Sequence, residues 1–480
     1  MKKITLIILI ALLTVGASFA NIVDSSKAVA EEVNANIASM GLKWEASANE
    51  AFVNQYLDAD VDTYEGLAAQ LNQYKELPEE LQKKVSDFLN GLNGRMNTSD
   101  DLYMSSYIMI NPEAVANSSF YRLEPVRNQQ YYGSCWAFST IGSFESAMAV
   151  QADGKATGNV DNGYDFSERW AGYHNIDWDL YSSSNYTVYQ DRDDLSGGNV
   201  YFSSYNSIRY GQMEEKNAPY SQVFITDEEG IPLPTSAYGA PLFKSNKTVM
   251  IPSAANMHAL GYTYEEYLNM IKTALKNYGS LSVSFSVPND YSAYAHGIYS
   301  PTVGSFGGGH AVTMVGWATA ADLDNIVLAG KVSGDAQPIV ATPITEYTYD
   351  DPTTGETGIT TNLFWIIKNS WDYVWGDGGY YVVPAVSEAQ YNGTVAIGRW
   401  QKENNSMYVP IFDSVDKHAG DNLDINHDGT VDGYDFMAMT AKLGSTDAAD
   451  IAACDIAYPA DGKITGDDLS TWVYLYNSRY

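Results

Sequence analysis

The side chains of Cys135, His310 and Asn369 are of the types that together perform nucleophilic catalysis on a carbonyl carbon. Cys135 directly precedes an apolar run that predicts a helix. A thiol at a helix N-terminus lies at the positive end of the macrodipole, which favours the nucleophilic thiolate. An imidazole can pair with that thiolate, and an amide oxygen that accepts its other N–H holds the ring in one tautomer. We therefore expect a thiolate–imidazolium pair oriented by Asn369.

The sequence around each of these residues favours such a site. Gln129, six residues before the cysteine, can donate from its amide, and with the backbone N–H of Cys135 it would form an oxyanion hole. His310 is the one histidine of six that follows a glycine run and leads an apolar strand, although such a residue can also be a core histidine. Asn369 follows an apolar strand, and Trp371 could shield its hydrogen bond; the alternative is an ordinary strand end.

The segment Tyr132-Gly133-Ser134-Cys135-Trp136 resembles the active-site motif of papain-like cysteine peptidases of the C1 family. The first cysteine of that motif is absent, so the chain looks like a disulfide-free, bacterial-type relative. The resemblance implies an α+β papain-like two-lobed fold, with a helical lobe and a β-barrel-like lobe. It also implies a substrate cleft bordered by four residues, namely Gly197, Gly198, Gly309 and Trp371.

The spacing of these residues predicts insertions. His310 follows Cys135 by 175 positions (310−135) and Asn369 by 234 (369−135), whereas roughly 130–150 is usual in plant and lysosomal enzymes of this kind. Two segments account for the excess, residues 177–195 and 319–362. We expect them on the cleft rim, where they would shape specificity, or on the surface without such a role.

Composition limits the classes of function. The 480 residues suggest about three structural units. The net charge of −32 excludes a surface built to bind nucleic acid or anionic lipid, and it suits calcium binding. We expect no cofactor for catalysis, and the partners of the catalytic domain should be protein or peptide substrates.

The N-terminal residues indicate export. Lys2 and Lys3 precede an apolar run that ends at an A-x-A-like site, so residues 1–20 are expected to be a signal peptide; a retained membrane anchor is the alternative. The protein would be secreted and associated with a scaffold or cell surface. Residues 21–117 predict helices, at 64–74 and from Pro78 to Gly94, and are interpreted as a helical pro-region of a zymogen or a permanent accessory domain. A maturation cut is expected between residues 114 and 121.

The C-terminus carries an acidic loop with calcium-ligand spacing. Its expected ligands are Asp424, Asn426, Asp428, Thr430, Asp432 and Asp435. A second, degenerate loop offers Asp455, Asp461, Lys463, Thr465 and Asp468. Counting places Ala457 at the first ligand position of this second loop, and Asp455 could serve there only if two residues are inserted.

Two loop–helix copies of this kind resemble a type I-like dockerin, a small all-α calcium-binding module that binds a cohesin domain of a cellulosomal scaffoldin. The expected domains are residues 118–400 for the peptidase, 401–420 for a linker and 421–480 for the dockerin, with calcium in a structural role. We thus expect a secreted cysteine endopeptidase attached to a scaffold. The alternatives are an inactive peptidase fold that only binds, and an aminopeptidase or transpeptidase.

Overall fold

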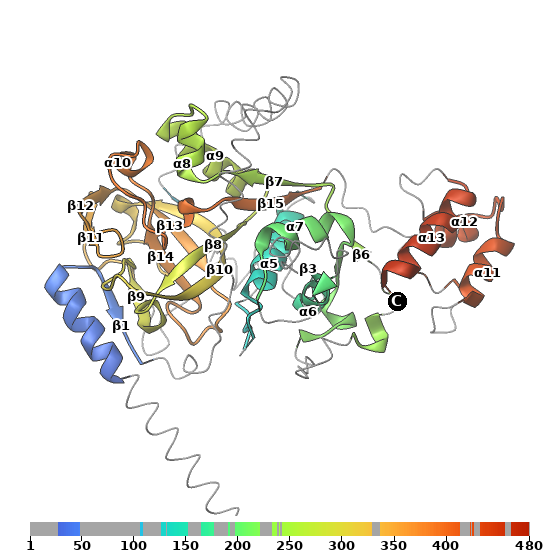
Figure 1. Ribbon diagram of the computed structural model, residues 1–480, viewed down its shortest axis with the longest axis horizontal. Coiled ribbons are helices and arrows are strands. Elements are labelled where there is room, and N and C mark those ends of the chain that lie inside the picture. The colour runs from blue at the N-terminus through green and yellow to red at the C-terminus, as the bar shows by residue number, and fades with distance from the viewer. Residues whose placement is uncertain are drawn as a thin grey trace, which may run out of the picture.

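A computed structural model describes most of the chain. The described residues are 27–48, 106–108, 126–130, 132–151, 165–176, 191–192, 197–220, 233–237, 240, 242–328, 337–412, 423, 425–426, 433–456 and 462–479. They form an α+β fold around a seven-stranded sheet (Figure 1). Across this part of the chain, no helix is long and apolar enough to cross a membrane. The helices predicted at 64–74 and 78–94 lie outside the described residues.

The main sheet is built around one long strand, β10. Its strand order is β14-β13-β10-β8-β15-β7, and β2 also pairs with β10. The bounds are β14 Tyr380–Pro384, β13 Leu363–Lys368, β10 Phe306–Thr319, β8 Leu281–Pro288, β15 Met407–Ile411, β7 Lys247–Ile251 and β2 Ser106–Ile108. The first half of β10 pairs with β8 and the second half with β13, so this strand joins two parts of the sheet. His310 lies opposite Phe285 of β8.

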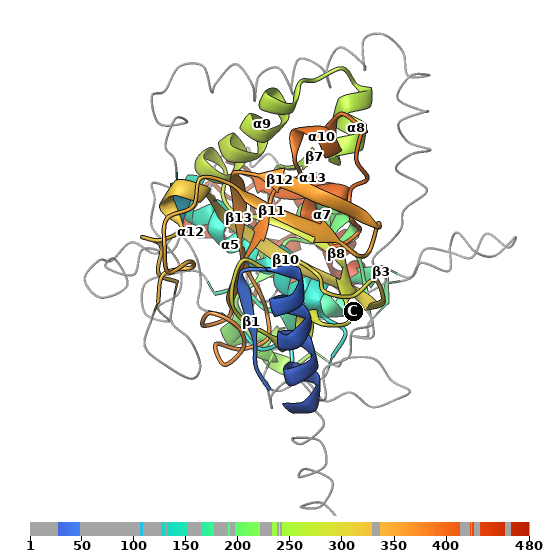
Figure 2. The same ribbon diagram turned by 90° about the vertical axis from the view of Figure 1, so that its left-hand side faces the viewer.

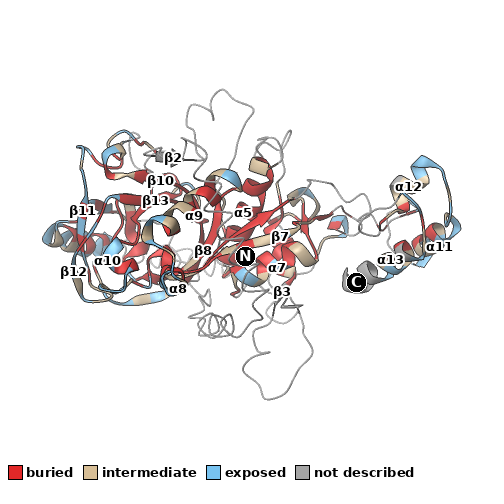
Figure 3. Ribbon diagram, turned by 90° about the horizontal axis from the view of Figure 1, so that it is seen from above, coloured by how far each residue is buried: buried red, intermediate tan, exposed pale blue. Residues whose placement is uncertain are grey.

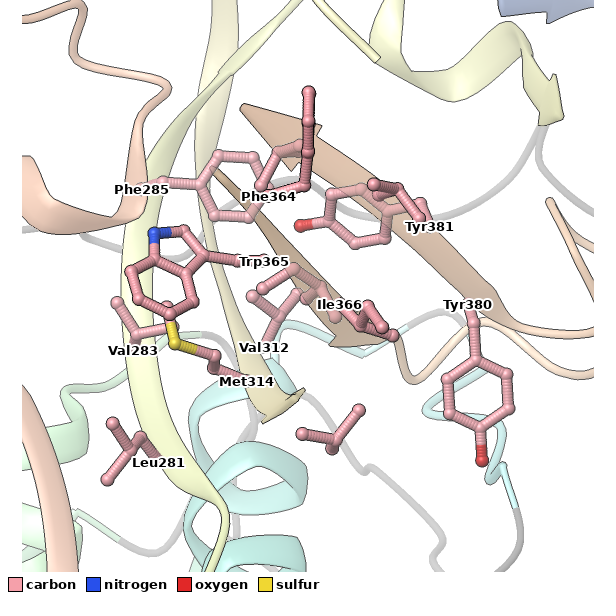
Figure 4. Close-up of a cluster of buried hydrophobic side chains, with 14 of the residues drawn as sticks. Leu281, Val283, Phe285, Val312, Met314, Phe364, Trp365, Ile366, Tyr380 and Tyr381 are labelled. Atoms are coloured by element: carbon pink, nitrogen blue, oxygen red, sulfur yellow. The ribbon is translucent and has the colours of Figure 1, made fainter. Parts of the chain in front are cut away.

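The central strands are apolar on both faces because both faces are covered. All six residues of β13 are buried, and its sequence Leu-Phe-Trp-Ile-Ile-Lys does not alternate as that of a half-exposed strand would. Figure 4 shows Phe364, Trp365 and Ile366 of this strand packed with side chains of the neighbouring strands. The sheet is therefore a rigid support for the residue that follows β13.

Helix α5 (Cys135–Gln151) packs tightly against the sheet. Fifteen of its 17 residues are buried (Figure 3), so it behaves as a core helix rather than an amphipathic one. Small serines allow the close approach: the Ser139 hydroxyl donates to the carbonyl of Val312 over 2.6 Å, and that of Ser143 to Ser280 over 2.6 Å. These buried hydroxyls fix the helix, and hence the residue at its first position, relative to β8 and β10.

The remaining helices have caps that the sequence indicates. The Ser167 hydroxyl accepts from the backbone amide of Trp170 at the start of α6 (Glu168–Tyr173). Helix α9 (Tyr264–Asn277) begins with a Thr263–Glu266 capping box. The other helices here are α7 Val200–Arg209, α8 Ala254–Ala259 and α10 Glu388–Tyr391. Three two-stranded antiparallel sheets complete this part of the fold. They pair β3 (Asn175–Ile176) with β4 (Asp191–Arg192), β5 (Gln212–Met213) with β6 (Leu242–Phe243), and β11 (Tyr347–Asp351) with β12 (Glu356–Thr361).

The expected linker at 401–420 begins inside the catalytic fold. Strand β15 pairs with both β7 and β8, and it is buried throughout. Its sequence Met-Tyr-Val-Pro-Ile combines apolar and β-prone residues, which bury well in a sheet. The boundary expected at residue 400 is therefore wrong, and the peptidase fold extends to at least residue 412.

The N-terminal segment, residues 27–48, docks on the catalytic fold. A helix over residues 27–40 leads to β1 (Trp44–Ala46), which pairs with β9 (Tyr294–Gly297) (Figure 2). The Trp44 indole is 4% exposed and donates to the carbonyl of Ser300 over 3.0 Å. Gly297 permits this contact, since a Cβ there would lie 2.3 Å from the carbonyl oxygen of Lys43. This part of residues 21–117 is thus an extra strand on the catalytic fold.

The C-terminal residues form a small helical unit with its own core. The unit contains α11 (Gly433–Ala441), α12 (Ala448–Cys454) and α13 (Gly466–Arg479). Its buried side chains are Leu423, Ile425, Met439, Cys454, Ile456, Ile464 and Trp472. Helices α11 and α13 are the helices of the two expected loop–helix copies, whereas α12 was not expected. Cys454 is a buried member of this core.

Candidate active site

The nucleophile candidate is fixed from two sides. Cys135 is the first residue of α5, and the segment that leads to it is hydrogen-bonded to the segment that carries Asn369. The backbone N–H of Gln129 donates to the backbone carbonyl of Ser370 over 2.9 Å, and Asn128 forms a β-bridge with Trp371. These backbone bonds hold the segment before Cys135 next to the segment that carries Asn369, although the two lie more than two hundred positions apart in the sequence.

His310 and Asn369 meet as the sequence predicts. The imidazole Nε2 lies 2.7 Å from the Asn369 Oδ1, so that Nε2–H donates to the amide oxygen. Trp371 stacks on the imidazole with ring centroids 4.5 Å apart, and it is 1% exposed. The indole therefore excludes water from this hydrogen bond. With Nε2 protonated, the other nitrogen of the neutral ring, Nδ1, is left as the basic atom.

Cys135 lies beside the backbone of the residue that follows His310. The backbone N–H groups of Ala311, Trp136 and Cys135 itself all hydrogen-bond toward the sulfur and lower its pKa. Burial has the larger effect, however, and raises the pKa of Cys135 to about 12. The helix N-terminus alone therefore does not produce a thiolate in this structure.

Burial acts on the imidazole in the same sense, against its charged form. It lowers the pKa of His310 to about 3, although the hydrogen bond to Asn369 acts in the opposite direction. The exposed fractions of Cys135 and His310 are only 2% and 1%. Burial in this closed form therefore opposes the ion pair expected from the sequence, and that ion pair stays a prediction.

Gln129 is placed differently from the simplest expectation. Its Nε2 donates to the carbonyl of Tyr132 over 2.8 Å, and its Oε1 accepts from the Ser370 hydroxyl over 2.7 Å. An amide nitrogen carries two N–H groups, so the second remains as the candidate donor to an oxyanion. Tyr220 supports this segment, because its hydroxyl donates to the Gln129 carbonyl over 2.8 Å and lies 2.8 Å from the hydroxyl of Ser134.

Of the glycines expected to border the substrate cleft, Gly198 lies against Trp136, the residue after the nucleophile. A Cβ on Gly198 would lie 2.4 Å from the ring of Trp136, so only glycine allows this contact. Gly197 has φ 139°, a backbone conformation that other residues rarely adopt. Gly309 pairs with Ser286 in the sheet and is buried. Trp371 has no exposed surface to offer a substrate in this form, and its visible contact is with His310.

Asp372 occupies a position where this motif usually has glycine. Its φ of 67° explains that preference, since a left-handed backbone is costly for most side chains. Aspartate tolerates the conformation when its carboxylate is bonded locally. Here Oδ1 accepts from the backbone N–H of Tyr373 over 2.6 Å. Oδ2 accepts from the side-chain amide of Asn128 over 3.1 Å.

The described part of the insertion at 319–362 contacts the segment around His296 and Ser300. The backbone carbonyl of Pro338 accepts from the His296 imidazole over 3.1 Å. The hydroxyl of Tyr347 lies 2.8 Å from the hydroxyl of Ser300. A cavity of about 550 Å³ is lined jointly by residues 337–342, by 42–45 and by His296 and Gly297. The described part of this insertion therefore packs where the N-terminal segment docks. Of the other insertion, 177–195, only residues 191–192 are described.

Among the expected calcium ligands, the structure describes the ends of each loop. In the first loop Asp435 is buried and accepts from the amide of Asn426 over 3.1 Å; Asp424, Asp428, Thr430 and Asp432 lie outside the described residues. In the second loop Asp468 accepts from the amides of Ile456 and Thr465 over 2.8 and 2.7 Å. Asp461 is not described, and Lys463 is exposed. Among the described residues, no group of three or more acidic, histidine or cysteine side chains forms a metal site.

The carboxylate of Asp455 contacts the described end of the second loop. Its Oδ2 accepts from the backbone amide of Gly462 over 2.7 Å. Its Oδ1 is buried and has no hydrogen-bond partner among the described residues. A buried carboxylate oxygen of this kind is chemically suited to bind a cation.

The sequence of this chain is similar to those of known cysteine proteases. The family model described as "Papain family cysteine protease" matches residues 112–160 and 188–397. Cathepsin B-like cysteine proteinase 3 of Caenorhabditis elegans is 23% identical over 343 residues, which cover 68% of this chain and 77% of that protein. Falcipain-3 of Plasmodium falciparum is 24% identical over 296 residues, covering 60% of this chain and 43% of that protein. Among solved structures, procathepsin B S9 from Trypanosoma congolense aligns over 81% of this chain and 98% of that chain, with 15% identity and a TM-score of 0.47.

Proposed function

Because the chain belongs to the papain family of cysteine proteases, whose model matches more than half of it, we propose that it is an endopeptidase acting through Cys135, His310, Asn369 and Gln129. Membership of the family makes it a cysteine peptidase; the residue roles and the internal cut are our proposal. One observation carries the roles. The Nε2 of His310 lies 2.7 Å from Asn369 beneath Trp371, with Cys135 hydrogen-bonded to the neighbouring backbone of Ala311.

In the proposed reaction, the thiolate of Cys135 attacks the carbonyl carbon of a peptide bond. The Cys135 N–H and one N–H of Gln129 hold the oxyanion. His310 donates its proton to the leaving amine and then activates water, which hydrolyses the thioester. Asn369 keeps the imidazole oriented through both steps, since its oxygen stabilises the protonated ring.

The closed site supports synthesis as an inactive precursor. Cys135 and His310 are only 2% and 1% exposed, so a peptide substrate can reach them only if the site opens. The docked strand β1 shows that part of the region 21–117 folds onto the catalytic domain. We propose that this region is a pro-region and that residues 1–20 direct secretion. N-terminal sequencing of the exported protein would give both cut sites, whereas an uncut region beginning near residue 21 in an active enzyme would make it an accessory domain.

The C-terminal unit is proposed to be a dockerin that binds calcium. The bond from Asp455 to Gly462 and the unpartnered Oδ1 suit a cation in the second loop, and Asp435 and Asp468 occupy corresponding ends of the two loops. Calcium would crosslink each loop to the helix that follows it. Titration with Ca²⁺ after chelation, followed by circular dichroism, tests this: helicity that does not depend on calcium would contradict the proposal.

An exposed apolar surface on this unit supports a protein partner. Tyr434 and Met437 of α11 are 69% and 65% exposed and lie three residues apart, on one side of the helix. Large exposed apolar side chains that neighbour one another are typical of interaction sites. We propose that this surface binds a cohesin domain of a scaffoldin. Binding measured by calorimetry should require calcium and should weaken in Tyr434→Ala.

The test of the catalytic proposal uses an epoxide inhibitor that reacts with active-site thiols. The wild-type chain should be labelled at Cys135 and lose peptidase activity, whereas Cys135→Ala should be neither labelled nor active. Cys454→Ala is the matched control, because it removes the other cysteine and should remain active. Lack of labelling after processing would indicate a protein that only binds. Digestion of a peptide library separates internal cuts from removal of N-terminal residues or transpeptidation.

A further inference from the structure

The backbone is strained at two positions beside the proposed active-site amides. Among the described residues, Gln130 and Asp372 are the only non-glycine residues with a positive φ, of 57° and 67°. A left-handed backbone is costly for such residues, which keep it only where neighbouring contacts hold them in place. Gln130 directly follows Gln129, and Asp372 lies three positions after Asn369. Both loops that carry these amides therefore need local support.

The side chain of Asn128 contacts both strained residues. Its Oδ1 accepts from the backbone N–H of Gln130 over 2.7 Å, and its Nδ2 donates to the Asp372 carboxylate over 3.1 Å. An asparagine amide has an acceptor oxygen and a donor nitrogen, so one orientation of the group satisfies both partners. Aspartate would keep the first bond but would place a second carboxylate beside that of Asp372. Asparagine is thus chemically suited to join these two loops.

Backbone bonds on either side of Asn128 join the same two segments. The N–H of Gln129 donates to the carbonyl of Ser370 over 2.9 Å, and the N–H of Asp372 donates to the carbonyl of the residue before Asn128 over 3.0 Å. The hydroxyl of Ser370 also donates to the Gln129 Oε1 over 2.7 Å. The direction of the Gln129 amide therefore depends on how the two segments lie against each other.

We infer that Asn128 is a positioning residue for the reaction, whose side chain holds the Gln129 amide where it can donate to the oxyanion. This inference rests on the role proposed above for Gln129. Without the Asn128 side chain, Gln130 and Asp372 lose contacts that offset their left-handed backbone. The two loops then relax, and the donor moves away from the carbonyl that Cys135 attacks.

The expected loss concerns the rate of the chemical step. A donor to the oxyanion acts mainly in the transition state, so its displacement lowers kcat and leaves KM nearly unchanged. Complete removal of one such donor costs about 10²–10³-fold in kcat, and displacement of Gln129 should cost less, about 10–100-fold. Alkylation of the Cys135 thiol by iodoacetamide forms no oxyanion, so its rate should stay within about threefold of wild type.

The experiment measures kcat and KM of the processed enzyme per active site titrated with the epoxide inhibitor, so that misfolded molecules are not counted. Asn128→Ala should lower kcat by about 10–100-fold, and Asn128→Asp should also lower it, since it lacks the donor to Asp372. Asn289→Ala is the matched control. This asparagine also joins two parts of the chain, through an exposed bond to the Ser305 hydroxyl over 2.8 Å, and its loss should leave kcat within about twofold of wild type.

A rescue variant tests the physical cause. Replacing both Gln130 and Asp372 by glycine in the Asn128→Ala protein should bring kcat back to within about fivefold of wild type, because glycine adopts a positive φ without support. A triple variant as slow as Asn128→Ala would overturn the inference, since backbone strain would then not be what displaces the donor.

The remaining outcomes separate this inference from the proposed function. An unchanged kcat in Asn128→Ala, with a loss in Gln129→Ala, would overturn the inference alone. Iodoacetamide reactivity that falls as much as kcat would do the same, because the defect would not be specific to the oxyanion. In the Gln129→Ala background, Asn128→Ala should lower kcat by less than about threefold further, and an additive loss would contradict the inference. An unchanged kcat in Gln129→Ala would instead refute the proposed role of Gln129 itself.

Discussion

Acidification should weaken the closed active site through His310, and the effect can be calculated from the structure. The imidazole has a pKa of about 3 in the folded chain, against 6.5 for a solvent-exposed histidine. The folded pKa is lowered, so this residue contributes stability that is complete above pH 6.5 and is lost as the pH falls toward 3. Between pH 7 and pH 5 the unfolded chain takes up most of one proton at this site and the folded chain takes up almost none. The free energy of unfolding should therefore fall by about 2 kcal/mol from this residue alone.

The assay is urea unfolding of the wild type and of His310→Gln at pH 7 and pH 5. The comparison with His310→Gln is required because Glu215 also titrates. Burial raises the pKa of Glu215 to about 9, so this residue makes the folded chain more stable as the pH falls from 7 to 5. The quantity of interest is the difference between the two proteins in how much stability changes with pH. We expect the wild type to lose about 2 kcal/mol more than the variant. Equal changes in both proteins would refute the argument that the closed fold excludes the imidazolium.

Three further predictions concern packing and backbone conformation. Gly198→Ala should destabilise the fold by about 1–3 kcal/mol in urea unfolding, because its Cβ would lie 2.4 Å from the buried Trp136 ring; an unchanged midpoint would mean that this contact is not required. Trp44→Ala should weaken docking of residues 27–48 by about 3–5 kcal/mol. The readout is faster hydrogen exchange at Ile298, whose backbone N–H donates to the carbonyl of Lys43 over 2.8 Å. Unaltered protection of this N–H would show that Trp44 does not hold the segment in place. Asp372→Gly should change stability by less than about 0.5 kcal/mol, whereas Asp372→Ala should cost about 1 kcal/mol, since alanine has neither the glycine freedom nor the carboxylate bonds that φ 67° requires; equal losses in the two variants would show that the backbone conformation is unimportant.

The sequence predicted the elements whose local signals were strong. Cys135 at the start of α5 and Asn369 after β13 lie where the motifs and apolar patterns placed them. The α+β fold and family membership were predictable for the same reason, since the motifs around these residues are specific. The contact between His310 and Asn369 was predictable only by resemblance, because 59 positions separate the two residues.

Other features could not be predicted because they depend on long-range packing. The burial of Cys135, which raises the pKa of the thiol against the effect of the backbone N–H groups, is not readable from local sequence. Strand β15 was mistaken for a linker since its partners, β7 and β8, are more than a hundred residues away. The burial of Lys402 against the Phe285 ring has no sequence signal, as a lysine among polar residues is normally solvent-exposed.

The pairing of β10 with β13 has a practical consequence for engineering. Thr319 and Leu363 are paired neighbours, and between them the chain leaves the sheet and returns to it. The intervening segment is therefore closed at its base by the sheet itself, and lengthening it costs closure entropy that grows only logarithmically. A foreign domain inserted in the turn at Thr354 and Gly355 should leave the pairing of β10 with β13 unchanged. This turn is therefore a suitable insertion site for fusion enzymes.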